Sequence, residues 1–145
     1  MFKIGNRKIG KNYPPLIVAE IGINHEGKMW KVKKMIDDAY EAGCECVKFQ
    51  YHIPEKEMIE NNTIPGNAQE SIWNIIKRCT LSHKNELEIF NYVKKKNLIY
   101  LSTPFSKEAA EKLYDMGVSG FKIGSGECNN IPLIDFISKF KKPII

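Results

Sequence analysis

Residues 16–50 read LIVAEIGINHEGKMWKVKKMIDDAYEAGCECVKFQ, and this stretch decides the fold. Its first six residues, Leu16–Ile21, are a short apolar run that is typical of a strand buried on both faces. Met29–Ala42 carries apolar residues at helical spacing along one stripe, and Gly43 follows where a helix commonly ends. Cys46–Gln50 is a second short strand. The stretch therefore predicts a strand–helix–strand unit with parallel strands.

The same alternation continues to residue 145. It predicts strands at 99–102 and 120–123, the start of a fifth strand at 143–145, and helices at 71–78, 82–97, 107–116 and 132–140. Ser82 and Ser106 are suited to cap two of these helices. Residues 51–70 contain Pro54, Pro65 and Gly66 and are predicted to form a loop. We expect the five strands to be neighbours in chain order, with the helices on one side of the sheet.

Two architectures fit this pattern, an open doubly wound sheet and a barrel. The first strand-to-helix turn has no G-x-G-x-x-G, which weakens a dinucleotide-binding interpretation. Polar residues collect instead at the strand ends, where a (β/α) barrel places its function. These residues are Glu20, Lys48, Gln50, Thr103, Lys122, Ser125 and Glu127. The fold class predicted is α/β, the N-terminal portion of a TIM (β/α)8 barrel.

The predicted elements also fall short of a whole barrel. Such a barrel takes about 250 residues, and residues 1–145 hold four βα units and the start of a fifth strand. We therefore expect residues 1–145 to be one incomplete domain of a longer chain, and to be catalytically silent alone.

Composition excludes several classes of protein. Of the 145 residues, 43% are hydrophobic and 27% charged, as in ordinary globular domains, and no apolar run is long enough for a membrane span. The N-terminus lacks the apolar core of a secretory signal, so a cytoplasmic protein is expected. The net charge of +5 is spread over scattered lysines without an aromatic platform, which argues against nucleic acid. The four cysteines form no C-x-x-C pair.

Two lysines lie in otherwise apolar strands. Lys48 and Lys122 could each pair with a strand-end carboxylate such as Glu20 or Glu127. They could equally bind an anionic substrate, or one of them could form a Schiff base. The strand-end position favours function, and the residues alone leave these alternatives open.

The neighbouring polar residues present similar choices. Glu20 and Glu127 are either ion-pair partners or general acid/base residues. Thr103, and Ser125 in its Gly-Ser-Gly turn, could offer donors to an oxyanion. The histidines have no metal-site spacing; for His25 and His52, which lie in strand-end loops, a structural role is favoured over a site role.

Five motifs extend these observations to a family. IVAEIGINHEG (17–27), VKFQ (47–50), IPGNA (64–68), LSTPF (101–105) and FKIGSGECNNIPLI (121–134) occur in this order. In order and spacing, the chain resembles N-acetylneuraminate (sialic acid) synthases from about residue 2 to 145. Legionaminate and pseudaminate synthases share much of the pattern, whereas NHEG and IPGNA lean toward the bacterial N-acetylneuraminate branch.

The resemblance implies a reaction. Phosphoenolpyruvate would condense with N-acetylmannosamine to give N-acetylneuraminate and phosphate, with no Schiff base. It implies that Lys48, Thr103, Lys122 and Ser125 bind phosphoenolpyruvate. It further implies that Gln50 and Asn67 contact the sugar, and that Glu20 and Glu127 are the catalytic acids near a metal ion, the sugar and the attacking water.

The resemblance also implies a cofactor and an assembly. A divalent metal, Mn2+ or Mg2+, would activate the aldehyde, with its two histidine ligands expected beyond Ile145, and the full-length protein would be a homodimer. The alternatives are a synthase for another nonulosonic acid, or a non-catalytic fragment that binds anions.

Overall fold

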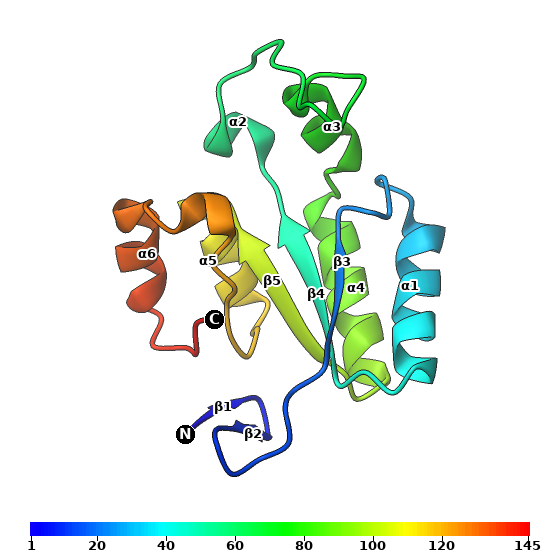
Figure 1. Cartoon of the computed structure of the whole chain (residues 1–145), viewed down its shortest axis with the longest axis vertical. Helices are drawn as coiled ribbons and strands as arrows, with labels where there is room; N and C mark the ends of the chain where they lie inside the picture. The colour runs from blue at the N-terminus through cyan, green and yellow to red at the C-terminus, as the bar shows by residue number, and fades with distance from the viewer.

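A parallel sheet forms the centre of the computed structural model, which describes residues 1–145 (Figure 1). Its strands are β3 (Val18–Gly22), β4 (Cys46–Tyr51) and β5 (Ile99–Pro104), in the order β3-β4-β5. The register sets Glu20 beside Lys48 and Gln50 beside Thr103. The side chains predicted to lie at the strand ends therefore occupy paired positions on neighbouring strands. The predicted parallel order is confirmed for these strands.

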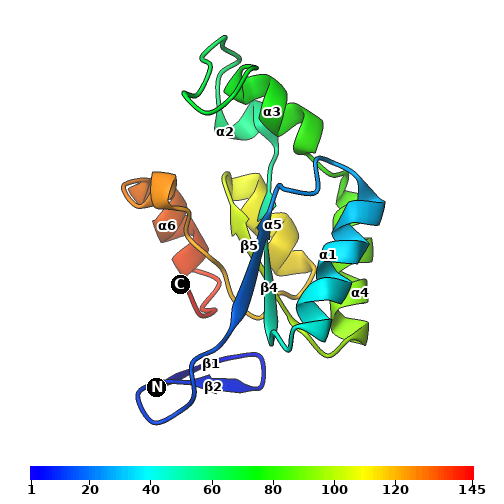
Figure 2. The same cartoon turned by 45° about the vertical axis from the view of Figure 1, so that its right-hand side comes forward.

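Helices follow the strands and cover one side of the sheet (Figures 1 and 2). They are α1 (Met29–Glu41), α4 (His83–Lys95), α5 (Lys107–Asp115) and α6 (Ile131–Ser138), whereas α3 (Ile72–Cys79) lies beyond the C-terminal ends of the strands (Figure 1). The hydroxyls of Ser82 and Ser106 each accept a backbone N–H three residues ahead, as predicted. Ser71 caps α3 in the same way.

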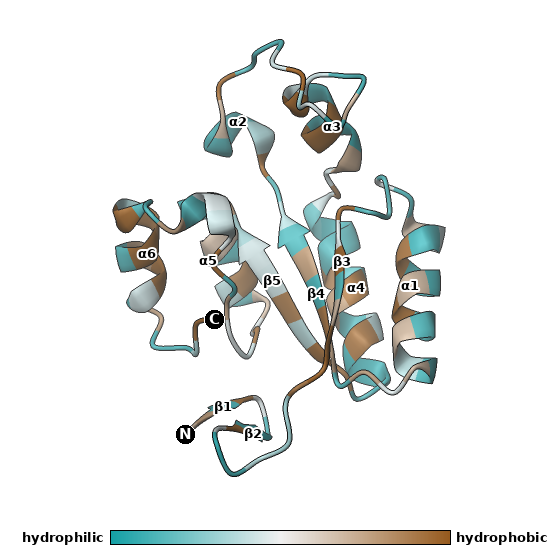
Figure 3. Cartoon of the chain, viewed as in Figure 1, coloured by the Kyte–Doolittle hydropathy of each residue, from teal (hydrophilic) through white to brown (hydrophobic).

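The core lies between the sheet and these helices. In Figure 3 the side of α1 toward α4 is hydrophobic and its outer side is hydrophilic. One cluster of 21 buried residues joins α1, α4, α5 and α6 to the strands. Val32 and Ile36 of α1 and Val93 of α4 are fully buried, as are Leu113 of α5 and Ile137 of α6. Each helix therefore packs against the sheet through its stripe of apolar residues at helical spacing.

The fourth and fifth predicted strands are present only as short extended segments. Phe121 and Ile144 form an isolated parallel bridge. Around it, Phe121 N–H donates to the Pro143 carbonyl at 2.9 Å and Ile123 N–H to that of Ile145 at 2.8 Å. Lys122 N–H donates to the Ser102 carbonyl at 3.1 Å, which joins this pair to β5. The neighbours are as predicted, but 120–123 and 143–145 are not full strands, because too few ladder bonds form.

Four elements were not predicted. Strands β1 (Phe2–Ile4) and β2 (Arg7–Ile9) form an antiparallel hairpin below the N-terminal ends of the sheet strands (Figure 1). Helix α2 (Pro54–Glu57) lies inside the stretch predicted as a loop, and a 3-10 turn covers Ser125–Glu127. None of the helices combines the length and apolarity needed to cross a membrane.

Candidate functional site

A cavity of about 520 Å³ opens at the C-terminal ends of the strands. Six of the eight predicted site residues line it: Glu20, Lys48, Gln50, Thr103, Lys122 and Ser125. They come from β3, β4, β5, the extended segment after β5, and the 3-10 turn. Residues 105 positions apart in sequence are thereby brought to one site by parallel strands that end at the same edge.

Lys48 and Glu20 form an ion pair across β3 and β4. Lys48 Nζ lies 2.8 Å from Glu20 Oε1. The lysine side chain is 8% exposed and the glutamate side chain 60% exposed, so a buried ammonium group pairs with a carboxylate that is open to the cavity. The ion pair that the sequence left open therefore exists. Because it lies in the cavity wall, it is compatible with binding of an anion by Lys48.

Thr103 and Lys122 add donors to the same cavity. The Thr103 side chain is 1% exposed, and its hydroxyl has no hydrogen-bond partner. A buried hydroxyl without a partner costs about 1–3 kcal/mol, which an oxygen-rich ligand in the cavity would offset. Half-buried Lys122 donates to the backbone carbonyl of Ile123. Two ammonium groups and a free hydroxyl facing one cavity suit a small ligand with carboxylate or phosphate oxygens.

Two predicted residues lie outside this cavity. Glu127 lines a neighbouring cavity of about 280 Å³ and accepts a hydrogen bond from Asn130 Nδ2 at 2.6 Å. Asn67 is exposed in a turn between α2 and α3, and it lines neither cavity. In this arrangement Glu127 supports the turn that presents Ser125, whereas Asn67 lies apart from the lining of both cavities.

The residues of this chain do not form a complete metal site. No group of three or more His, Cys, Asp and Glu side chains is placed to hold an ion. Glu20, the one carboxylate in the cavity, is paired with Lys48.

His52, for which the sequence favoured a structural role, lies behind the cavity and contacts two of its lining residues. His52 Nδ1 lies 2.7 Å from Glu57 Oε1, and His52 Nε2 lies 3.0 Å from Oε1 of the cavity residue Gln50. The His52 ring stacks on Phe105, another cavity residue, with centroids 4.4 Å apart. The only available signal was a histidine two residues past the strand-end glutamine.

His25, for which the sequence also favoured a structural role, does not line the cavity. It is 1% exposed, and its Nδ1 accepts the Gly27 N–H at 3.0 Å. Burial lowers the pKa of His25, and the nearby His52 lowers it further. Gly27 itself has φ +74°, and a Cβ there would lie 2.5 Å from the Arg78 carbonyl oxygen. This loop is thus fixed by its backbone against the end of α3.

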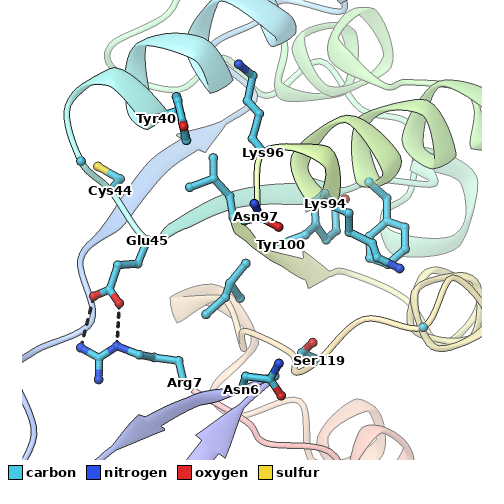
Figure 4. Close-up of a pocket in the computed structure, with 16 residues that line it drawn as sticks. Asn6, Arg7, Tyr40, Cys44, Glu45, Lys94, Lys96, Asn97, Tyr100 and Ser119 are labelled. Atoms are coloured by element: carbon cyan, nitrogen blue, oxygen red, sulfur yellow. Dashed lines mark hydrogen bonds and ion pairs between the residues drawn. The ribbon is translucent and has the colours of Figure 1, made fainter.

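A larger cavity of about 840 Å³ lies at the opposite, N-terminal ends of the strands (Figure 4). Arg7 of the hairpin forms two hydrogen bonds to the Glu45 carboxylate there, at 2.6 and 3.2 Å. Lys96 at its edge is paired with Asp37. In parallel (β/α) structures catalysis collects at the C-terminal ends of strands. The cavity of about 520 Å³ at the C-terminal ends of the strands is therefore the candidate active site.

The fold is that of the N-terminal part of a TIM barrel, and two lysines and two hydroxyl side chains line a cavity at the C-terminal ends of its strands. The sequence profile of the NeuB family matches residues 35–145, more than half of the chain. The chain belongs to the NeuB family.

Relatives and a solved structure agree with this assignment. The chain is 34% identical to the spore coat polysaccharide biosynthesis protein SpsE of Bacillus subtilis, over 99% of this chain and 39% of SpsE. It is 36% identical to the N,N'-diacetyllegionaminic acid synthase of Campylobacter jejuni, over 90% of this chain and 41% of that enzyme. The N-acetylneuraminic acid synthetase of Leptospira borgpetersenii superposes with a TM-score of 0.81 at 28% identity, covering 99% of this chain and 56% of that one.

These matches identify the family of the chain but not the sugar acid that it makes. The chain spans about two fifths of the length of the curated relatives that it matches. The synthases among them make different sugar acids, including legionaminic and pseudaminic acid. The comparisons therefore give a family of sialic acid and related nonulosonic acid synthases, without separating the products.

Proposed function

We propose that the complete protein condenses phosphoenolpyruvate with N-acetylmannosamine to give N-acetylneuraminate and phosphate. One observation carries the proposal: Lys48, Lys122, Thr103 and Ser125 line a single cavity at the C-terminal strand ends. Phosphoenolpyruvate has a carboxylate and a phosphate, and binding both requires cations together with N–H or O–H donors.

The proposed steps use these residues in two groups. Lys48 and Lys122 hold the two anionic groups of phosphoenolpyruvate, with the Thr103 and Ser125 hydroxyls as further donors. Gln50 and Asn67 contact the sugar, and Glu20 exchanges a proton with the sugar or the attacking water, supported by Glu127. The methylene carbon of phosphoenolpyruvate bonds to the aldehyde carbon, water adds at the former enol carbon, and phosphate leaves by C–O cleavage.

The proposal extends to the cofactor and the assembly. We place the histidine ligands of a divalent ion, Mn2+ or Mg2+, outside residues 1–145, as the family resemblance implies. We further propose a cytoplasmic homodimer for the complete protein.

A second candidate is synthesis of legionaminate or pseudaminate. It is favoured by the 36% identity to the Campylobacter legionaminic acid synthase, a higher identity than that to SpsE. Both candidates use the same anion site and differ in the sugar that the cavity accepts.

The experiment that tests the function supplies the complete protein with phosphoenolpyruvate, a divalent metal and one N-acyl sugar at a time. Phosphate release and product mass are measured. N-acetylmannosamine should give N-acetylneuraminate at the highest kcat/KM. Preference for a diacetylated sugar would support the second candidate, and a lack of phosphate release with every sugar would contradict both.

Replacing Lys48 tests the anion site. In the complete protein, Lys48→Ala should raise the KM for phosphoenolpyruvate by about 10- to 150-fold, because a charge-assisted contact worth about 1.5–3 kcal/mol is lost. Lys34→Ala is the matched control, since Lys34 also sits in an ion pair, with Asp38, but on the outer helix α1. Equal kinetics in the two variants would remove Lys48 from the substrate site.

A further inference from the structure

Gln50, His52 and Glu57 form a buried chain of hydrogen bonds behind the candidate cavity. His52 links the other two through its two ring nitrogens, at 2.7 Å to Glu57 and 3.0 Å to Gln50. The His52 and Glu57 side chains are each 3% exposed. Glu57 Oε2 also accepts the Ile53 N–H at 3.3 Å, which fixes the carboxylate to the start of α2. Of these three side chains, only Gln50 lines the candidate cavity.

The donor and acceptor roles in these two hydrogen bonds follow from the atoms that face each other. Both ring nitrogens of His52 face oxygen atoms, Oε1 of Glu57 and Oε1 of Gln50. Two acceptors match a ring that donates N–H from both nitrogens, which is the doubly protonated form. In that form the buried Glu57 side chain, 2.7 Å away, would pair with the ring, since a buried ion is stable only when it is paired.

The orientation of the Gln50 amide is then fixed. Its oxygen is held by His52, so its NH2 group is directed away from the ring. A Cβ placed on Gly22 would lie 3.9 Å from Gln50 Nε2 and 3.4 Å from Glu20 Oε1. The amide nitrogen and the Glu20 carboxylate therefore share the cavity wall beside Gly22, and the absence of a side chain at Gly22 leaves them accessible.

We propose that His52 and Glu57 are positioning residues that hold Gln50 as a hydrogen-bond donor toward an acceptor oxygen of the sugar substrate. The inference rests on the proposed function, in which Gln50 contacts the sugar. If His52 were neutral, with Nδ1–H donating to Glu57, its Nε2 would need a donor and the Gln50 amide would turn around. Its carbonyl oxygen would then face the cavity and repel the same substrate oxygen.

The first measurement concerns the geometry and needs no activity. In 15N-histidine-labelled complete protein, both His52 ring nitrogens should show the NMR signature of a bonded proton, with His52→Gln used for assignment. A proton on only one ring nitrogen would overturn the proposed orientation. This result stands whether or not the protein proves to be a synthase.

The second measurement is kinetic. His52→Ala and Glu57→Gln should each raise the KM for N-acetylmannosamine about tenfold, the size of one lost hydrogen bond, and change the KM for phosphoenolpyruvate less than about twofold. Glu57→Gln keeps the shape of the side chain and replaces His52→Ala if that variant does not fold. His83→Gln is the control, because His83 bonds Tyr51 at 2.9 Å and lines neither polar cavity.

A double substitution separates positioning from a direct role. If His52 acts through Gln50, adding His52→Ala to Gln50→Ala should raise the sugar KM no further. Multiplying effects, or a larger change in the KM for phosphoenolpyruvate than in that for the sugar, would overturn the proposal. Absence of turnover in the unsubstituted protein would instead refute the proposed function and leave the NMR result as the test of the geometry.

Discussion

Glu20→Gln should lower kcat of the complete protein by about 100-fold or more, the usual contribution of a positioned proton donor or acceptor. The substitution keeps the shape of the side chain and removes its charge. Glu20 is the one carboxylate in the candidate cavity, and its side chain is largely exposed to that space. It is therefore placed to exchange a proton with the sugar or with the attacking water.

The alternative role for Glu20 gives the opposite pattern. If Glu20 only balances the charge of Lys48, 2.8 Å away, its loss would free the ammonium group. Phosphoenolpyruvate would then bind more tightly, so its KM would fall while kcat stayed near that of the unsubstituted protein. Glu26→Gln is the matched control, because Glu26 lies in the connection that follows β3 and pairs with Lys28 and Lys31 outside the cavity.

The sheet and its outer helices were predictable because local signals and tertiary packing agree. The apolar stripe of Met29–Ala42 and the capping serines Ser82 and Ser106 act within one helix each, and the structure uses them in the predicted way. The hairpin β1–β2 gave no comparable signal. It is only two strands of three residues, and Arg7 ties it to Glu45, 38 positions away. A contact of that kind cannot be read from spacing.

The site was predictable to a similar extent and for a related reason. Lys48, Gln50 and Thr103 follow from strand register alone, because parallel strands bring their C-terminal ends to one edge. Glu127 and Asn67 lie in a turn and a long connection, where the path of the backbone, rather than a repeat, sets the position. The link from His52 to the cavity was not predictable, because it depends on Glu57 in helix α2, and that proline-containing segment was predicted to be a loop.

Stability should show an unusual dependence on pH that originates in Glu86. This residue of α4 is 3% exposed, and its Oε2 accepts the Tyr100 hydroxyl at 3.1 Å. Burial raises the pKa of Glu86 from 4.5 to about 8. Between these values the folded protein holds a proton that the unfolded chain releases. The free energy of unfolding must therefore fall as the pH rises through this range.

The expected size and the control complete this prediction. At about 1.4 kcal/mol per pKa unit, the contribution of Glu86 lost by about pH 8 is several kcal/mol, at most roughly 5. Urea unfolding of the complete protein at several values between about pH 5 and 8 measures it. Glu86→Gln should remove the slope, because an amide does not titrate. Glu88→Gln should keep it, since Lys33 lowers the pKa of the exposed Glu88 and its titration lies below this range. The same slope in Glu86→Gln as in the unsubstituted protein would mean that Glu86 is charged in the folded state, and that the hydrogen bond from Tyr100 offsets its burial.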